Sequence, residues 1–220
     1  MVEKLNMNGI DSFLYDYPRM LLLPLNEGSI CLKGIYEFQA VFGDKPTIHD
    51  EYSIHIEIPK DFPFHLPVVK EIGGKIPANA DNHINSDGSI CLGSPINLLK
   101  KIHSNPTLNT FAKKCITPYL YAMSYKSKYG GDLIFGELSH GVMGLFEDYK
   151  ELFNVKNEEA VFRTLDILAS KKREANKKIC PCGCNRKSGQ CNFRKNLIEF
   201  RGMASRNYYK YQYAVLKAYF

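Results

Sequence analysis

Two runs of alternating apolar and polar residues limit the folds open to this 220-residue chain most strongly. The first run occupies residues 36–42 and the second residues 52–58, with Gly-Asp-Lys-Pro at 43–46 between them. Because side chains alternate between the two faces of a strand, each run predicts a half-buried strand, and the turn residues predict an antiparallel pair. Residues 20–25 and 68–72 predict further extended segments, and we expect another short one just before residue 81.

The remaining periodic segments predict helices. Residues 1–20 predict a short first helix, and residues 108–123 place apolar side chains at the i, i+3, i+4, i+7 spacing of a helix packed on a sheet. Pro118 should kink that second helix. Two more helices are expected within residues 145–168, the later one with Asn157 as its N-cap. Strands and helices together predict an α+β fold.

One loop combines turn-forming residues with a cysteine and a histidine. Residues 85–88 read Asn-Ser-Asp-Gly, which favours a turn, and Cys91 follows that turn. His83 lies eight residues upstream, and an imidazole can donate a hydrogen bond or accept a proton near neutral pH. A Cys/His pair is the minimum for acyl transfer, so we interpret Cys91 as a nucleophile and His83 as its partner.

Less specific interpretations of the same residues stay open. A cysteine between Ile90 and Leu92 is commonly a small buried hydrophobe, and His83 could merely hydrogen-bond a neighbouring aspartate. Cys31 and Cys115 lie within apolar patterns, so we expect both to be structural.

Two stretches resemble the ubiquitin-conjugating enzyme family: IPKDFPFHLPVV at 58–69 and HINSDGSICLG at 83–93. The resemblance covers roughly residues 35–99, and the cysteine loop is its best-matched part. It implies a four-stranded antiparallel sheet packed on helices, with an acyl group carried as a thioester on Cys91.

The chain departs from the family at one triplet. The family places His-Pro-Asn eight to ten residues before its cysteine, and that asparagine supports the oxyanion formed during aminolysis. The aligned residues here are Asp81, Asn82 and His83. The ungapped spacing puts His83 in the asparagine's place, where its N–H could bind the oxyanion or its free nitrogen could deprotonate an attacking lysine. A shifted alignment would give Asn82 this role instead.

Four further cysteines crowd into twelve residues: Cys180, Cys182, Cys184 and Cys191. Four thiolates on short glycine-containing loops suit tetrahedral zinc, and free or regulatory thiols are the alternative. The run resembles the SEC-C zinc motif, with Cys180, Cys182 and Cys191 in register. The motif's last ligand position is Asn192 here, so Cys184 would have to supply the fourth ligand.

Charge and composition suggest how the chain is organised. Residues 151–220 carry 15 Lys/Arg against 6 Asp/Glu, and residues 1–150 carry 14 against 17, so the positive charge lies near the C-terminus. We predict a conjugating domain at 1–170 and, at 171–220, a basic linker with a small zinc-knuckle and helical appendage. The absence of a long apolar run predicts a cytoplasmic protein without a membrane partner. The terminal tyrosines are expected to dock on protein rather than bind nucleic acid.

The resemblance implies a transferase that passes a protein C-terminus from Cys91 to an amine. Its partner would be a protein substrate or modifier with a reactive C-terminus, activated by another protein. Stand-alone bacterial relatives work in anti-phage systems beside cyclic-oligonucleotide synthases, so a cGAS-like nucleotidyltransferase is one such candidate partner. A catalytically inactive binding module is the alternative, and a cysteine hydrolase that uses Asp81 or Asp87 to orient His83 is a second.

Overall fold

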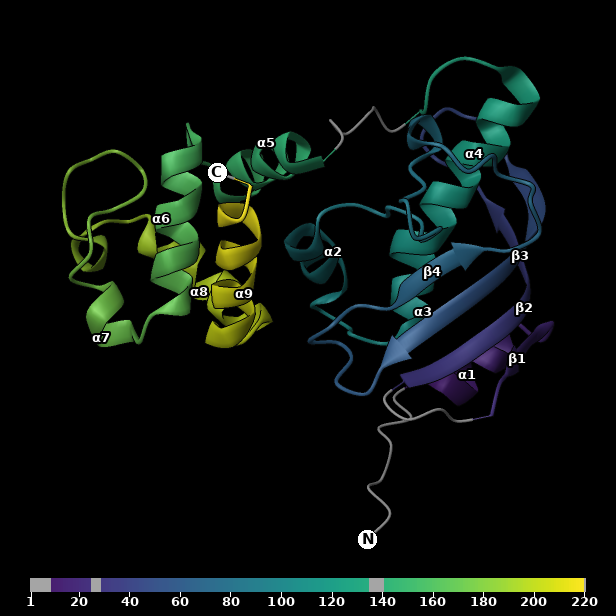
Figure 1. Cartoon of the computed structure of the whole chain (residues 1–220), viewed down its shortest axis with the longest axis horizontal. Helices are drawn as coiled ribbons and strands as arrows, with labels where there is room; N and C mark the ends of the chain where they lie inside the picture. Colours follow the sequence, from purple (N-terminus) through teal and green to yellow (C-terminus); the bar gives the residue numbers. More distant parts are fainter. Residues whose placement is uncertain (1–8, 25–28, 135–140, 220) are drawn as a thin grey trace, which may run out of the picture. The chain divides into compact units, whose positions relative to one another are not determined.

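A computed structural model describes residues 9–24, 29–134 and 141–219 (Figure 1). The chain divides into two compact units. The first comprises Met1–Gly93 and Lys101–Glu137, and the second comprises Ser94–Lys100 and Leu138–Phe220. The division therefore falls near residue 137, whereas the sequence predicted a boundary at 170/171. Residues 141–169, assigned to the conjugating domain from sequence, group with the C-terminal segment.

The first unit is built on a four-stranded antiparallel sheet whose strands follow one another in chain order. The long central pair places Tyr36 opposite Tyr52 and Ile30 opposite Ile58, so the alternating runs share one buried face. This mixed α/β arrangement with four antiparallel strands confirms the coarse fold prediction. The strands are β1 (Met20–Leu22), β2 (Ser29–Ala40), β3 (Ile48–Pro59) and β4 (Val68–Glu71).

Helices cover the apolar face of this sheet. The predicted helix 108–123 is interrupted, because a π-helical turn stands directly before Pro118. Proline lacks an N–H and clashes with the preceding turn, and the wider π turn accommodates it. Helix α4 then packs on β2 and β3. The helical elements are α1 (Ile10–Asp16), α3 (Leu108–Phe111), η2 (Ala112–Ile116) and α4 (Thr117–Tyr129).

The segment before the cysteine loop is not the strand that the sequence predicted. It forms a short 3₁₀ helix, η1 (Ala80–Asn82), capped by the side chain of Asn79. In the described structure, two isolated bridges, Lys70 with Ser89 and Ile84 with Ile90, provide the strand pairing of this region. Helix α2 (Pro95–Ile102) follows the loop.

The second unit is mainly helical, and α6 contacts α5, α7, α8 and α9. Asn157 caps α6 as predicted, since its Oδ1 accepts the Ala160 N–H at 2.9 Å. Tyr208 and Tyr209 are buried, which agrees with docking of the terminal helix, whereas Tyr211 is exposed. The elements are α5 (Gly141–Phe153), α6 (Glu158–Ala169), α7 (Lys172–Ala175), η3 (Ser188–Gln190), α8 (Arg194–Met203) and α9 (Arg206–Lys217).

None of the helices in the described ranges has the length and apolarity needed to cross a bilayer.

Candidate functional site

The loop around Cys91 folds back on itself as the sequence predicted. Gly88 adopts a positive φ of 79°, and its N–H donates to the Asn85 carbonyl at 2.9 Å, which closes the turn. Past the turn, the Cys91 N–H donates to the His83 carbonyl at 2.7 Å. The two predicted site residues are therefore directly hydrogen-bonded through their backbones, although eight residues separate them.

The carboxylate of Asp87 stabilises the turn through hydrogen bonds to Ser89. Asp87 Oδ1 accepts bonds from the Ser89 N–H at 2.9 Å and from the Ser89 hydroxyl at 2.6 Å. The Ser89 hydroxyl in turn accepts a bond from Asn85 Nδ2 at 3.0 Å. The bonds from Ser89 lower the pKa of the Asp87 carboxyl below its ordinary value. The loop is thus held in shape by its own polar side chains.

The three cysteines of the first unit differ in accessibility. Cys91 is partly exposed, whereas Cys31 and Cys115 are buried, as the sequence predicted for those two. Burial raises the pKa of the Cys115 thiol to about 11, which suppresses its thiolate form. Within the described part of this unit, Cys91 is the one thiol that is partly exposed.

Asn82 and His83, the two candidate partners of Cys91, have different environments. The Asn82 carboxamide is engaged on both sides, because Nδ2 donates to the Pro77 carbonyl at 3.0 Å and Oδ1 accepts from Lys126 Nζ at 3.2 Å. His83 is largely buried and has a left-handed backbone (φ 54°), a conformation in which histidine is enriched. Hydrogen bonds at both ends of its carboxamide therefore hold the Asn82 side chain in place.

Tyr119 is a part of this site that the sequence reading missed. Its position on the apolar stripe of the 108–123 helix indicated only a core residue, and 91% of it is indeed buried. Its hydroxyl, however, donates to the Asn82 carbonyl at 2.6 Å. Burial raises its pKa above the ordinary value, and proximity of Cys91 adds to the effect. Helix α4 thereby anchors the residue that precedes His83.

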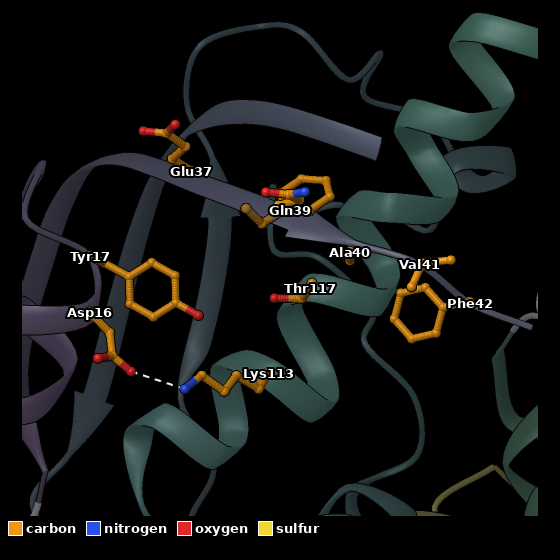
Figure 2. A pocket seen from close by; sticks show the side chains of 10 residues that line it. Asp16, Tyr17, Glu37, Gln39, Ala40, Val41, Phe42, Lys113 and Thr117 are labelled. Carbon is orange, nitrogen blue, oxygen red and sulfur yellow. Dashed lines mark hydrogen bonds and ion pairs between the residues drawn. The ribbon is translucent and has the colours of Figure 1, made fainter. Parts of the chain in front are cut away.

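Two hollows lie among the described residues of the first unit. One, of about 370 Å³, is lined by Asn82, Lys75 and Lys126 among others, and it adjoins the loop at Asn82. The other, of about 530 Å³, lies over β2 and the start of α4, where Asp16 and Lys113 form an ion pair (Figure 2). The described residues that line this larger hollow include no cysteine or histidine, so it lacks a nucleophile of the kind expected.

The four C-terminal cysteines form a second site. Their sulfur atoms all lie within 4.8 Å of one another. Cys182 Sγ is 3.2 Å from Cys180 Sγ and 3.6 Å from Cys191 Sγ, and Cys184 Sγ is 3.6 Å from Cys191 Sγ. Zn–S bonds of about 2.3 Å in a tetrahedron would place the sulfurs about 3.8 Å apart. The cluster, Cys184 included, can hold a metal ion.

The cysteines of the cluster differ in acidity. Burial raises the pKa values of the Cys180 and Cys182 thiols, so a metal ion bound by these residues would displace their protons. The Arg186 backbone N–H, together with bonds from the Cys182 and Arg186 side chains, lowers the pKa of Cys184 to about 6. Asn192, at the position of the usual fourth ligand, is exposed. The donor set is therefore four sulfurs.

With both sites described, the chain was compared with protein-family models, with curated proteins and with solved structures, and none of the three comparisons found a match.

Proposed function

We propose that the protein is a ubiquitin-conjugating-like transferase that carries the C-terminus of another protein as a thioester on Cys91 and passes it to an amine. The observation that carries this proposal is the pairing of Cys91 with His83 through a 2.7 Å backbone bond, with Cys91 partly exposed. Support also comes from the sheet of four antiparallel strands in chain order that precedes the loop, as the family resemblance implies.

The transfer has two steps. In the first, the Cys91 thiolate attacks the carbonyl of an activated C-terminus held by another protein, and the leaving group of that donor departs. In the second, a neutral amine attacks the thioester carbonyl, a tetrahedral oxyanion forms, and its collapse makes an amide and releases the Cys91 thiolate. The amine loses one proton to a base, and no redox change occurs.

His83 is the side chain proposed to serve the second step. The Asn82 carboxamide is held by bonds from Nδ2 to the Pro77 carbonyl and from Lys126 Nζ to Oδ1, which fix its orientation, and the ungapped spacing to Cys91 favours His83. A preorganised donor at an oxyanion is worth about 3 kcal/mol, or roughly a hundredfold in rate. Tyr119 bonds to the Asn82 carbonyl and the Cys91 N–H bonds to the His83 carbonyl. These two bonds fix the backbone at residues 82 and 83 and would supply that preorganisation for His83.

The metal proposed for the four-cysteine cluster is zinc, in a structural role. Four sulfur donors with no position for water or substrate are typical of closed structural zinc sites, and such ions contribute directly to folding. The ion would hold the chain from residue 180 to residue 191 in its present shape.

The partner proposed is a protein with a reactive C-terminus, of which a cyclic-oligonucleotide synthase of the anti-phage systems is one candidate. Another protein would supply activation. A cytoplasmic location accompanies this proposal.

The test is intact-mass spectrometry, under acidic non-reducing conditions, of protein co-expressed with its genomic neighbours. Wild type should carry a protein-sized adduct that added thiol removes. Cys91→Ser should carry the same mass as a thiol-resistant ester, and Cys91→Ala should carry none. An adduct that persists on Cys91→Ala would argue against the transferase. The absence of an adduct from both wild type and Cys91→Ser would also argue against it and would favour a binding module.

A second measurement separates the steps and the competing hydrolase. His83→Ala should slow aminolysis by roughly a hundredfold while thioester formation stays within a fewfold of wild type. If His83→Ala slows thioester formation and aminolysis equally, His83 does not serve as the oxyanion donor. Rapid loss of the thioester to water without any amine would instead identify a hydrolase.

A further inference from the structure

A small cavity of about 150 Å³ lies in the second unit, apart from the cysteine sulfurs. It is formed by the end of α6, by α7, by the η3 turn and by the first two turns of α8. Ile167 and Ile198 contribute apolar wall, and Asn176 and Ser188 contribute polar groups. Its volume suits one compact chemical group rather than a whole cofactor, because sites for drug-sized ligands start at about 300 Å³.

The charges around this cavity are of one sign. Lys172, Arg194 and Arg201 line it, and no carboxylate is found among its described lining residues. Within the described ranges, none of these three cations forms an ion pair. An anion bound in the cavity would be attracted by all three positive charges and would serve as their counter-ion.

Arg201 is fixed in place at the cavity. Its Nη2 donates to the Ile167 carbonyl at 2.7 Å and its Nη1 donates to the Ser170 carbonyl at 3.2 Å, so it caps the C-terminal end of α6. Burial, and the nearby charge of Arg206, lower the pKa of this guanidinium. A guanidinium has five N–H donors, and two bonds leave others for a ligand.

The opposite wall is also firmly held. The Ser188 hydroxyl donates to the Ala175 carbonyl at 2.5 Å, and the Gly189 N–H donates to the Asn176 carbonyl at 3.2 Å. A Cβ at position 189 would approach Asn176 Cβ to 2.9 Å, so the η3 turn packs closely on the residues after α7. Arg194 reaches back to the Gly189 carbonyl at 3.4 Å. The η3 wall of the cavity is therefore held in place, and Arg194 lies beside it.

We propose that this cavity binds the phosphate group of a phosphorylated ligand through Lys172, Arg194 and Arg201. A tetrahedral dianion can accept bonds from several cationic groups that line one cavity, and guanidinium groups bind phosphate oxygens with paired N–H donors. The net positive charge of residues 151–220, 15 Lys/Arg against 6 Asp/Glu, would raise the local concentration of such anions. This site is independent of the transfer chemistry proposed for Cys91.

The experiment is calorimetric titration of the full-length zinc-loaded protein with inorganic phosphate and with a nucleoside 5′-monophosphate. Lys172→Gln and Arg194→Gln, which alter exposed side chains, should each weaken binding by about tenfold. Lys195→Gln and Lys217→Gln remove the same charge outside the cavity and should stay within twofold of wild type. No binding of either probe to wild type, or equal losses in all four variants, would overturn the proposal.

Two further arms distinguish the source of the phosphate. A 5′-phosphorylated oligonucleotide that binds at least tenfold more tightly than its unphosphorylated form would identify a terminal phosphate on nucleic acid. Equal affinity of the mononucleotide and the phosphorylated oligonucleotide would identify the phosphate alone as the recognised group. The contrary outcome is that the unphosphorylated oligonucleotide binds as tightly as the phosphorylated one, with an affinity that Lys172→Gln and Arg194→Gln leave unchanged. That result would overturn the cavity as the phosphate site.

Discussion

The two units use cysteine in opposite ways. In the first, Cys91 stands apart from other thiols, partly exposed, on a loop fixed by backbone bonds and by Asp87. In the second, four sulfurs lie within 4.8 Å of one another. An isolated accessible thiol can attack an electrophile, whereas four converging thiols compete for one cation. The neighbours of a cysteine, more than the residue itself, decide its chemistry.

The largest expected effect concerns the cluster. Cys184→Ser replaces a sulfur ligand with a poorly coordinating hydroxyl, so zinc affinity should fall by at least about 100-fold. Competition with a chromogenic chelator measures this change. The matched control is Asn192→Ala, which alters the position of the usual fourth ligand and should leave zinc affinity unchanged. Loss of zinc in the Asn192 variant, with retention in the Cys184 variant, would reverse the ligand assignment.

A second prediction contrasts thiols within the first unit. On the zinc-loaded protein, maleimide should label Cys91 at least about tenfold faster than Cys31 or Cys115, because those two thiols are buried. The raised pKa of Cys115, about 11 against an ordinary 9.0, lowers its thiolate fraction further. Peptide mapping of a labelling time course gives the three rates. Faster labelling of Cys115 would contradict the structural roles assigned here.

A third prediction tests how helix α4 supports the loop. Tyr119→Phe removes the hydroxyl that donates to the Asn82 carbonyl at 2.6 Å and leaves a buried acceptor unpaired. The free energy of unfolding should fall by about 1–2 kcal/mol, measured in urea. Tyr129→Phe, on the same helix but exposed, should change it by less than about 0.5 kcal/mol. If the two variants have equal stability, the bond does not hold the loop.

The smallest effect concerns the turn itself. Ser89→Ala removes the hydroxyl bond to Asp87, so the pKa of that carboxyl should rise toward 3.8, as an NMR titration would show. The folded-state pKa is depressed, so the bond stabilises the fold above the ordinary value near 3.8 and is lost as the pH falls through the folded value. An unchanged titration would mean that the backbone N–H of Ser89 alone sets this pKa.

Local patterns in the sequence were sufficient for much of the fold. Alternation predicted the central strand pair, and helical spacing predicted the helices that cover it. The turn at residues 85–88 followed from its Asn-Ser-Asp-Gly chemistry. The strand expected before residue 81 was wrong, because Asn79 caps a 3₁₀ helix there instead. Local propensity cannot rank two short conformations when side-chain caps decide between them.

The amino-acid sequence alone was enough to identify the candidate nucleophile, the four clustered cysteines and the elements that carry them, because these depend on residue type and spacing within short segments. The three-dimensional packing showed that Tyr119 anchors Asn82, that the Asn82 side chain bonds to Pro77, and that three cations line one cavity. It also placed residues 141–169 with the C-terminal unit. Such contacts join residues far apart in the chain, and long-range packing, not local pattern, selects them.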